Sequence, residues 1–164
     1  MPTEASLIVR PAVPEDAPAL AELYLGSRAA AYPAIPHGVH PPDDVRRWVT
    51  GWFGRDPATR TEVWLAEDPG AGAPVGLLLV EGDWVHSVYV APGRTGEGVG
   101  TLLLDLAKSL SPRGLGLYVF ESNHRARRFY ARHGFVEVRR SDGLGESGNE
   151  EQQPDVELAW PGTP

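Results

Sequence analysis

Three short β-rich runs follow one another between residues 63 and 90, and their spacing restricts the fold more than any other feature. The runs are Val63–Glu67, Val75–Glu81 and Trp84–Val90, separated by Asp68–Pro74 and by Gly82-Asp83. Connections this short join antiparallel neighbours, because a parallel pair needs a crossover of a dozen or more residues. The sequence therefore predicts an antiparallel meander in the first half of the chain.

Helical spacing precedes the meander. A short strand, Leu7–Arg10, leads to a helix for which Asp16 is the N-cap candidate. Prolines recur every few residues in Tyr32–Pro42, which rules out a regular helix there. An apolar stripe at helical spacing then predicts a second helix at about Asp43–Phe53.

Helices and strands alternate after the meander. The expected order is helix, strand, helix and two strands, over Val99–Leu110, Leu115–Phe120, Asn123–His133, Phe135–Arg140 and Val156–Trp160. No internal repeat and no linker divides the chain. We therefore expect one α+β domain over residues 1–164, with a mixed, mostly antiparallel central sheet flanked by helices.

Composition excludes several kinds of site. The chain has no cysteine, so disulfides, thiolate metal sites and a cysteine nucleophile are excluded, and a reducing cytoplasm is the expected location. The N-terminal residues lack a signal peptide, and the apolar runs are too short to span a bilayer. We expect no membrane partner and no metal, because the remaining candidates do not form a ligand set: His37, His40, His124 and His133.

The charge is unevenly distributed. The net charge of −7 argues against nucleic acid as a partner. Residues 94–140 hold nine basic and four acidic residues, a local balance of +5, which suits an anionic ligand unless these charges simply face water. Residues 141–155 hold five carboxylates and no basic residue, and we expect a mobile acidic surface loop or a functional one.

A glycine-rich turn lies between the third β-rich run and the helix that follows it. Gly96, Gly98 and Gly100 allow the backbone to approach a ligand, and the helix start adds free amides that suit a phosphate or pyrophosphate. A P-loop would need Lys-Ser/Thr after its last glycine, and a Rossmann turn would need G-x-G-x-x-G. Neither fits, because Val99 follows Gly98 and Thr101 follows Gly100. A tight turn without a ligand is the alternative.

A second pattern, N-x-x-A-x-x-F-Y-x-x-x-G-F, runs from Asn123 to Phe135. Its Ala126, Phe129 and Tyr130 share one helical face, so core packing is one interpretation of Tyr130.

Together the two segments resemble the GNAT superfamily of N-acetyltransferases, and so does the order of elements over essentially the whole chain. The family's pyrophosphate-binding turn, Q/R-x-x-G-x-G/A, is matched by Thr95-Gly96-Glu97-Gly98-Val99-Gly100, with Thr95 in place of Gln or Arg and Arg94 just before it. The family's N-x-x-A-x-x-F/L-Y-x-x-x-G-F stretch is matched at every motif position.

The resemblance implies a fold and a set of roles. The central strands Trp84–Val90 and Leu115–Phe120 would be a splayed pair with a wedge for acetyl-coenzyme A. Asn123 would contact the pantetheine arm, and Tyr130 would protonate the departing thiolate. The remaining cofactor-binding residues would act largely through their backbones: Val88, Tyr89, Val90, Thr95, Gly96, Glu97, Gly98, Val99, Gly100 and Thr101.

A base would help the acceptor amine, and His86 is the candidate because some members of the family place a histidine on this strand. Strand alternation is expected to put Trp84, His86, Val88 and Val90 on one face. Other members use a nearby glutamate or ordered waters, and His86 as a hydrogen-bonded sheet residue is the structural alternative. Backbone N–H near Val88 would polarise the acetyl carbonyl.

In the family the acceptor usually enters between the first two helices and the last hairpin, which corresponds to Tyr32–Pro42 and residues 141–155. Tyr32 and Trp84, with the carboxylates, would suit a cationic amine. The expected function is direct acetyl transfer from acetyl-coenzyme A to a primary amine of a small molecule or peptide. A non-catalytic acyl-coenzyme A sensor is the alternative, and a homodimer is left open.

Overall fold

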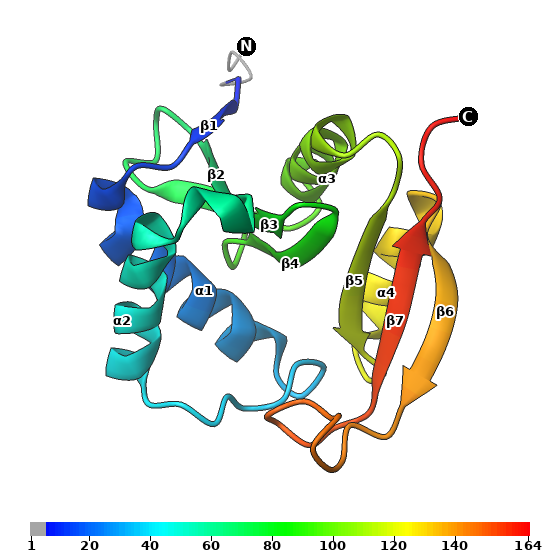
Figure 1. Ribbon diagram of the computed structural model, residues 1–164. Helices are drawn as coiled ribbons and strands as arrows, with labels where there is room; N and C mark the ends of the chain where they lie inside the picture. Colours follow the sequence, from blue (N-terminus) through cyan, green and yellow to red (C-terminus); the bar gives the residue numbers. More distant parts are fainter. Residues whose placement is uncertain (1–5) are drawn as a thin grey trace.

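The computed structural model describes residues 6–164 and contains a seven-stranded sheet with helices on both faces (Figure 1). Its elements are β1 (Ile8–Pro11), α1 (Ala17–Ala31), α2 (Pro42–Gly51), β2 (Thr61–Glu67), β3 (Pro74–Glu81), β4 (Trp84–Val90), α3 (Val99–Leu110), β5 (Leu115–Phe120), α4 (His124–Arg132), β6 (Val136–Ser141) and β7 (Asp155–Trp160). The predicted α+β class and the predicted order of elements are confirmed. Asp16 ends a short 3-10 helix immediately before α1, and its carboxylate accepts from the Val13 N–H.

The sheet is divided at its centre. The strand order is β1-β2-β3-β4-β5-β7-β6, and the pairs on either side of β4–β5 are antiparallel. Strands β4 and β5 run parallel, and their register contains one pair, Trp84 with Gly116. Beyond this pair the two strands diverge, as Figure 1 shows. The predicted splayed strand pair is therefore confirmed.

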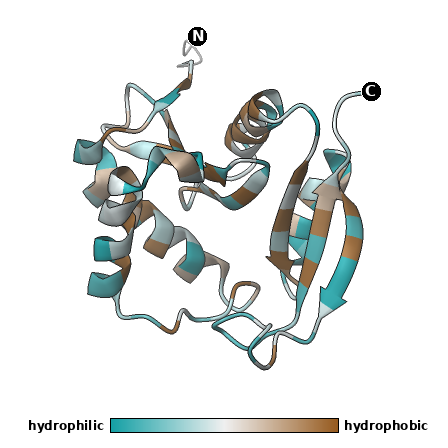
Figure 2. Ribbon diagram, viewed as in Figure 1, coloured by the Kyte–Doolittle hydropathy of each residue, from teal (hydrophilic) through white to brown (hydrophobic). Residues whose placement is uncertain are grey.

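Two apolar cores hold the layers together. One core lies under α3 and α4 and includes residues from both halves of the sheet, among them Leu78 on β3 and Leu117 on β5. The other lies between α1, α2 and the β2–β4 face, around Leu20 and Leu77. Figure 2 shows apolar residues concentrated on β3, β5 and α3. Among the described residues, no helix is long and apolar enough to cross a bilayer.

The β4 strand departs from strict alternation. Leu79 pairs with Ser87 and Val80 pairs with Val85, so one extra β4 residue, His86, bulges between them. A bulge shifts the alternation by one position. Consequently Val85, with Val88 and Val90, belongs to the α3 side of the sheet. The prediction that Trp84 and His86 share a face with Val88 and Val90 is therefore wrong.

Gly76 fixes how closely α3 approaches the sheet. A Cβ atom there would lie 2.6 Å from Val99 Cγ1 and 2.8 Å from Leu103 Cδ1, both on α3. Gly76→Ala is therefore expected to overpack this contact and lower the free energy of unfolding by about 1–3 kcal/mol. Chemical denaturation measures this. Gly51→Ala is the control, since nothing lies within 4 Å of its Cβ position, and it should not destabilise the protein. Equal free energies of unfolding for the two variants would contradict the close approach of α3 to Gly76.

Candidate active site

The N-terminus of α3 is an open cradle of backbone amides. Gly98 is the N-cap, with φ of +84°, and Gly96 also has positive φ, +85°. No side chain caps the helix, and the Leu102 N–H is bonded to the Gly98 carbonyl. The amides of Val99, Gly100 and Thr101 therefore precede the helical hydrogen-bond ladder, which is the arrangement that binds anions.

Neighbouring side chains hold this cradle in place. Arg94 donates to Asp68 at 3.0 Å and to Glu97 at 2.6 Å, so its guanidinium is engaged in ion pairs. A Cβ on Gly100 would lie 3.3 Å from Phe129 on α4, so this glycine allows a close contact of α3 with α4. Thr95, Gly96, Glu97 and Gly98 are exposed, which leaves the turn accessible to a ligand.

The side of β4 that faces β5 is an open strand edge. The Ala91 N–H donates to Val75 on the β3 side, and antiparallel alternation turns the peptide groups of Val88 and Val90 the other way, toward the split. The Val90 carbonyl accepts from the buried Ser27 hydroxyl at 2.8 Å. The peptide groups of Val88 border the split where β5 has diverged.

Tyr130, on α4, belongs to the core that also contains Val85 of β4 and Leu117 of β5. It is 9% exposed and packs edge-on against Phe129 and Phe135. Burial raises its pKa, and the nearby Tyr89 adds to the rise. The hydroxyl is therefore protonated at neutral pH, as a proton donor must be. No hydrogen bond within residues 6–164 occupies it.

Asn123 has a structural role besides any contact with a ligand. Its side-chain oxygen accepts from the Ala126 N–H at 3.3 Å and caps α4. This bond uses Oδ1, and no hydrogen bond within residues 6–164 uses the side-chain NH2 group. The motif asparagine thereby orients the helix that carries Tyr130.

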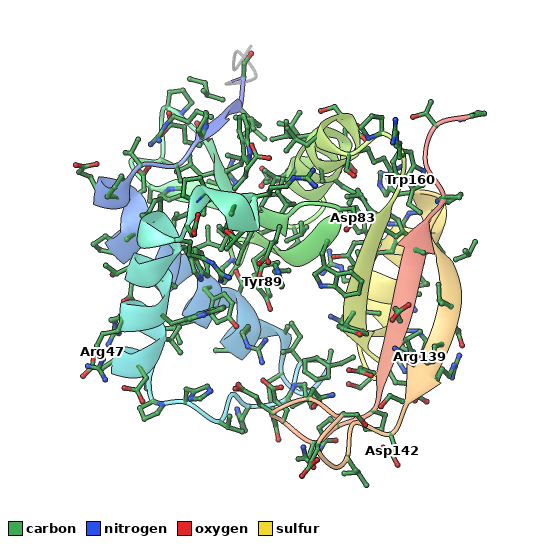
Figure 3. All side chains as sticks on the ribbon, viewed as in Figure 1. Arg47, Asp83, Tyr89, Arg139, Asp142 and Trp160 are labelled. Carbon is green, nitrogen blue, oxygen red and sulfur yellow. The ribbon has the colours of Figure 1, made fainter. Side chains whose placement is uncertain are left out.

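A chain of contacts that the sequence did not predict leads from Tyr89 on β4 to Glu151 in the β6–β7 loop. Arg28, on α1, donates to the Tyr89 hydroxyl at 3.1 Å and to Glu151 at 3.0 Å. The Tyr24 ring lies 5.1 Å from the Tyr89 ring. In Figure 3, Tyr89 projects into the region between β4 and α1. The spacing of Tyr24 and Arg28 places them on one helical face, but nothing local indicates that this face meets residue 151.

A cavity of about 590 Å³ adjoins this chain of contacts. Its lining comes from three segments: residues 24–29 of α1, residues 36–48 of the α1–α2 loop and α2, and Glu150 and Glu151 of the β6–β7 loop. Two side-chain contacts join that loop to the other segments, the ion pair of Arg28 with Glu151 and the hydrogen bond between His40 and Glu150 at 2.8 Å. The cavity thus lies between the first two helices and the last hairpin.

Three candidate residues lie apart from the cavity lining. His86 sits at the β4 bulge, where its Nε2 is 3.3 Å from Glu81, which also pairs with Arg55. Trp84 packs over Gly116 and edge-on against Tyr118, at the junction of β4 and β5. Tyr32 is 52% exposed and stacks on His37. The structure therefore does not bring Tyr32 and Trp84 together.

Comparison with known proteins identifies relatives of part of the chain. Residues 59–137 match the acetyltransferase (GNAT) domain family. The chain is 38% identical, over 74 residues, to the peptidyl-lysine N-acetyltransferase YjaB of Salmonella typhimurium. This match covers 44% of the chain, and it spans only half the length of that curated relative.

Solved structures share the fold over almost the whole chain. The solution structure of apo-form YjaB from Escherichia coli has a TM-score of 0.72 at 24% identity, covering 96% of this chain and 99% of that one. The PaiA N-acetyltransferase of Thermoplasma acidophilum, in complex with coenzyme A, has a TM-score of 0.65 at 17% identity, covering 94% and 98%. The residues that line the cavity all lie outside the family match at 59–137.

Proposed function

We propose that the chain, whose residues 59–137 match the GNAT acetyltransferase domain family, transfers the acetyl group of acetyl-coenzyme A to a primary amine. The observation that carries the proposal is the position of the β4–β5 split. The α3 cradle follows the end of β4, Tyr130 belongs to the core shared by residues of β4 and β5, and Arg28 of the cavity lining contacts Tyr89 on β4.

The residues of the cradle fit a coenzyme A pyrophosphate. Gly96 and Gly98 adopt backbone conformations that L-residues rarely take, and open space surrounds both. The backbone of Thr95–Thr101 would hold the phosphates, and the peptide groups of Val88 and Val90 that face the split would pair with the pantetheine amides. The peptide groups of Tyr89 face β3 instead. Asn123 is proposed to contact the same arm through its side-chain amide. The bound thioester supplies the activated acetyl group.

The proposed transfer is direct. The amine nitrogen forms a bond to the thioester carbonyl carbon, the carbon–sulfur bond breaks, and the sulfur leaves as a thiolate. The Tyr130 hydroxyl donates its proton to this sulfur. Peptide N–H groups at the Val88 edge would stabilise negative charge on the carbonyl oxygen. The proton released by the amine passes to His86 or to water.

His86 allows a direct test of the base. If it accepts the amine proton, His86→Gln should lower kcat/KM by about 100-fold and abolish the acidic limb of the pH–rate profile. Glu81→Gln serves as the comparison, because it removes the 3.3 Å carboxylate contact and keeps the imidazole. Steady-state rates between pH 5.5 and 9 measure both. An unchanged profile in His86→Gln would assign the base role to water.

The acceptor is an amine of a small molecule or a peptide. Two features of the cavity support a cationic acceptor: the aromatic rings of Tyr24 and Trp48, and the carboxylates at its rim. An acceptor screen read by free thiol tests the function, with polyamines, amino acids, aminoglycosides and peptides as amines. Acetyl-coenzyme A binding without thiol release from any amine would favour a non-catalytic acyl-coenzyme A sensor.

A further inference from the structure

Three carboxylates and one guanidinium line the acceptor cavity, those of Asp44, Glu150, Glu151 and Arg28. Arg28 donates to the Tyr89 hydroxyl on β4 and pairs with Glu151 at 3.0 Å. Asp44, in the first turn of α2, and Glu150 lie where the α1–α2 loop meets the β6–β7 loop. The Glu150 carboxylate lies 2.8 Å from His40 Nε2. Arg47, the partner of Asp44, lies on the outer side of α2 (Figure 3).

This excess of carboxylates suits an amine that carries a second cation. The attacking amine must be neutral, so it does not compensate a carboxylate of the lining. A carboxylate stabilises an ammonium group. Glu150, with which no arginine or lysine of residues 6–164 pairs, therefore suits a group that stays protonated while another amine of the same molecule reacts.

The lining also contains aromatic and aliphatic side chains. The Trp48 ring lies 5.4 Å from the Tyr24 ring, in an edge-to-face arrangement. Trp48 is 47% exposed and Val39 is 55% exposed, although both line the cavity. Large apolar side chains left open at a cavity favour an apolar or aromatic ligand frame.

The size of the cavity favours a small acceptor. Its volume of about 590 Å³ is typical of pockets for small ligands. The β6–β7 loop borders it and is bonded to α1 through Glu151 and to the α1–α2 loop through Glu150.

We propose, as an extension of the acetyltransferase function above, that the acceptor is a small diamine with an apolar or aromatic frame. One amine accepts the acetyl group on the side of the cavity where Arg28 contacts Tyr89. The second stays protonated against Glu150 and Asp44. A lysine side chain of a protein has no second cation in this position and is the poorer acceptor.

A matched pair of amines tests the second cation. The probes are 1,4-bis(aminomethyl)benzene and 4-methylbenzylamine, which differ in one amino group, and a lysine-containing peptide is the third acceptor. We expect kcat/KM to be about tenfold higher for the diamine than for the monoamine, and lowest for the peptide. Glu150→Gln should lower kcat/KM about threefold to fivefold more for the diamine than for the monoamine, through KM. Glu146→Gln, an exposed change in the same loop, is the control.

Calorimetric binding of the diamine to the full chain separates this proposal from the function on which it rests. Saturable binding that Glu150→Gln weakens and Glu146→Gln does not supports the diamine site, even if no amine releases thiol. Thiol release that is fastest with the peptide overturns the diamine proposal and leaves acetyl transfer standing. Diamine binding that is absent, or insensitive to Glu150→Gln, also overturns it.

Discussion

Gly98→Asp is expected to weaken acetyl-coenzyme A binding by at least about 100-fold, which corresponds to roughly 2.7 kcal/mol. Two effects contribute. The φ of +84° is unfavourable for an L-residue by about 1–2 kcal/mol, which favours a rearranged turn. The new carboxylate also stands at the start of α3, where it repels a pyrophosphate and competes for the free amides.

Gly98→Ala separates these two effects, because it introduces the same backbone strain without the charge. A Cβ at this position meets nothing within 4 Å, so neither variant should create a steric clash with the rest of the fold. Calorimetric titration with acetyl-coenzyme A measures both affinities, and thermal melting checks folding. If Gly98→Asp binds acetyl-coenzyme A as tightly as the wild type, the cradle is not the pyrophosphate site.

Tyr130→Phe is expected to lower kcat by about 100-fold while acetyl-coenzyme A affinity stays within about twofold of the wild type. The change removes only the hydroxyl, and no hydrogen bond within residues 6–164 holds that group. The free energy of unfolding should therefore change by less than about 1 kcal/mol. Pre-steady-state thiol release with a saturating acceptor measures the chemical step.

The pH dependence of the Tyr130→Phe effect follows from the burial of the side chain. Burial raises the pKa of Tyr130 above its usual value of about 10, so the donor form persists on the alkaline side of neutrality. The loss in kcat should therefore be the same at pH 7 and pH 9. Tyr118→Phe, at a position 55% exposed, is the control and should leave kcat unchanged. A similar loss in both variants would argue against proton donation by Tyr130.

The fold was predictable from the sequence because its signals are local. The short Gly82-Asp83 connection made β3 and β4 antiparallel neighbours, and Pro112-Arg113-Gly114 ended α3. The bulge at His86 was not predictable, because Trp84–Val90 reads as a regular strand. The bulge exists only in the register with β3, where Val80 opposes Val85 and Leu79 opposes Ser87. That register depends on the pairing of two strands, so the sequence of one strand does not reveal it.

The two halves of the candidate site differ in the same way. The cradle at Gly96, Gly98 and Gly100 occupies alternate positions within five residues at a helix start, so its shape follows from local sequence. The acceptor cavity depends on Arg28 meeting Tyr89, 61 positions away, and Glu151, 123 positions away. The resemblance to the GNAT family implied that an acceptor would enter between the proline-rich and acidic segments. They did not indicate that Tyr24, Arg28 and Trp48 would form its walls.

The single residue pair between β4 and β5 also bears on self-association. An unpaired strand edge usually invites a strand from another chain. Here the two unpaired edges face each other inside one molecule, and one shared core beneath them joins the two half-sheets. A second polypeptide therefore cannot add a strand to the sheet at this point. A narrow ligand with amide groups can enter along the strands. The central gap thus offers backbone hydrogen bonding to a thin ligand while withholding it from neighbouring copies.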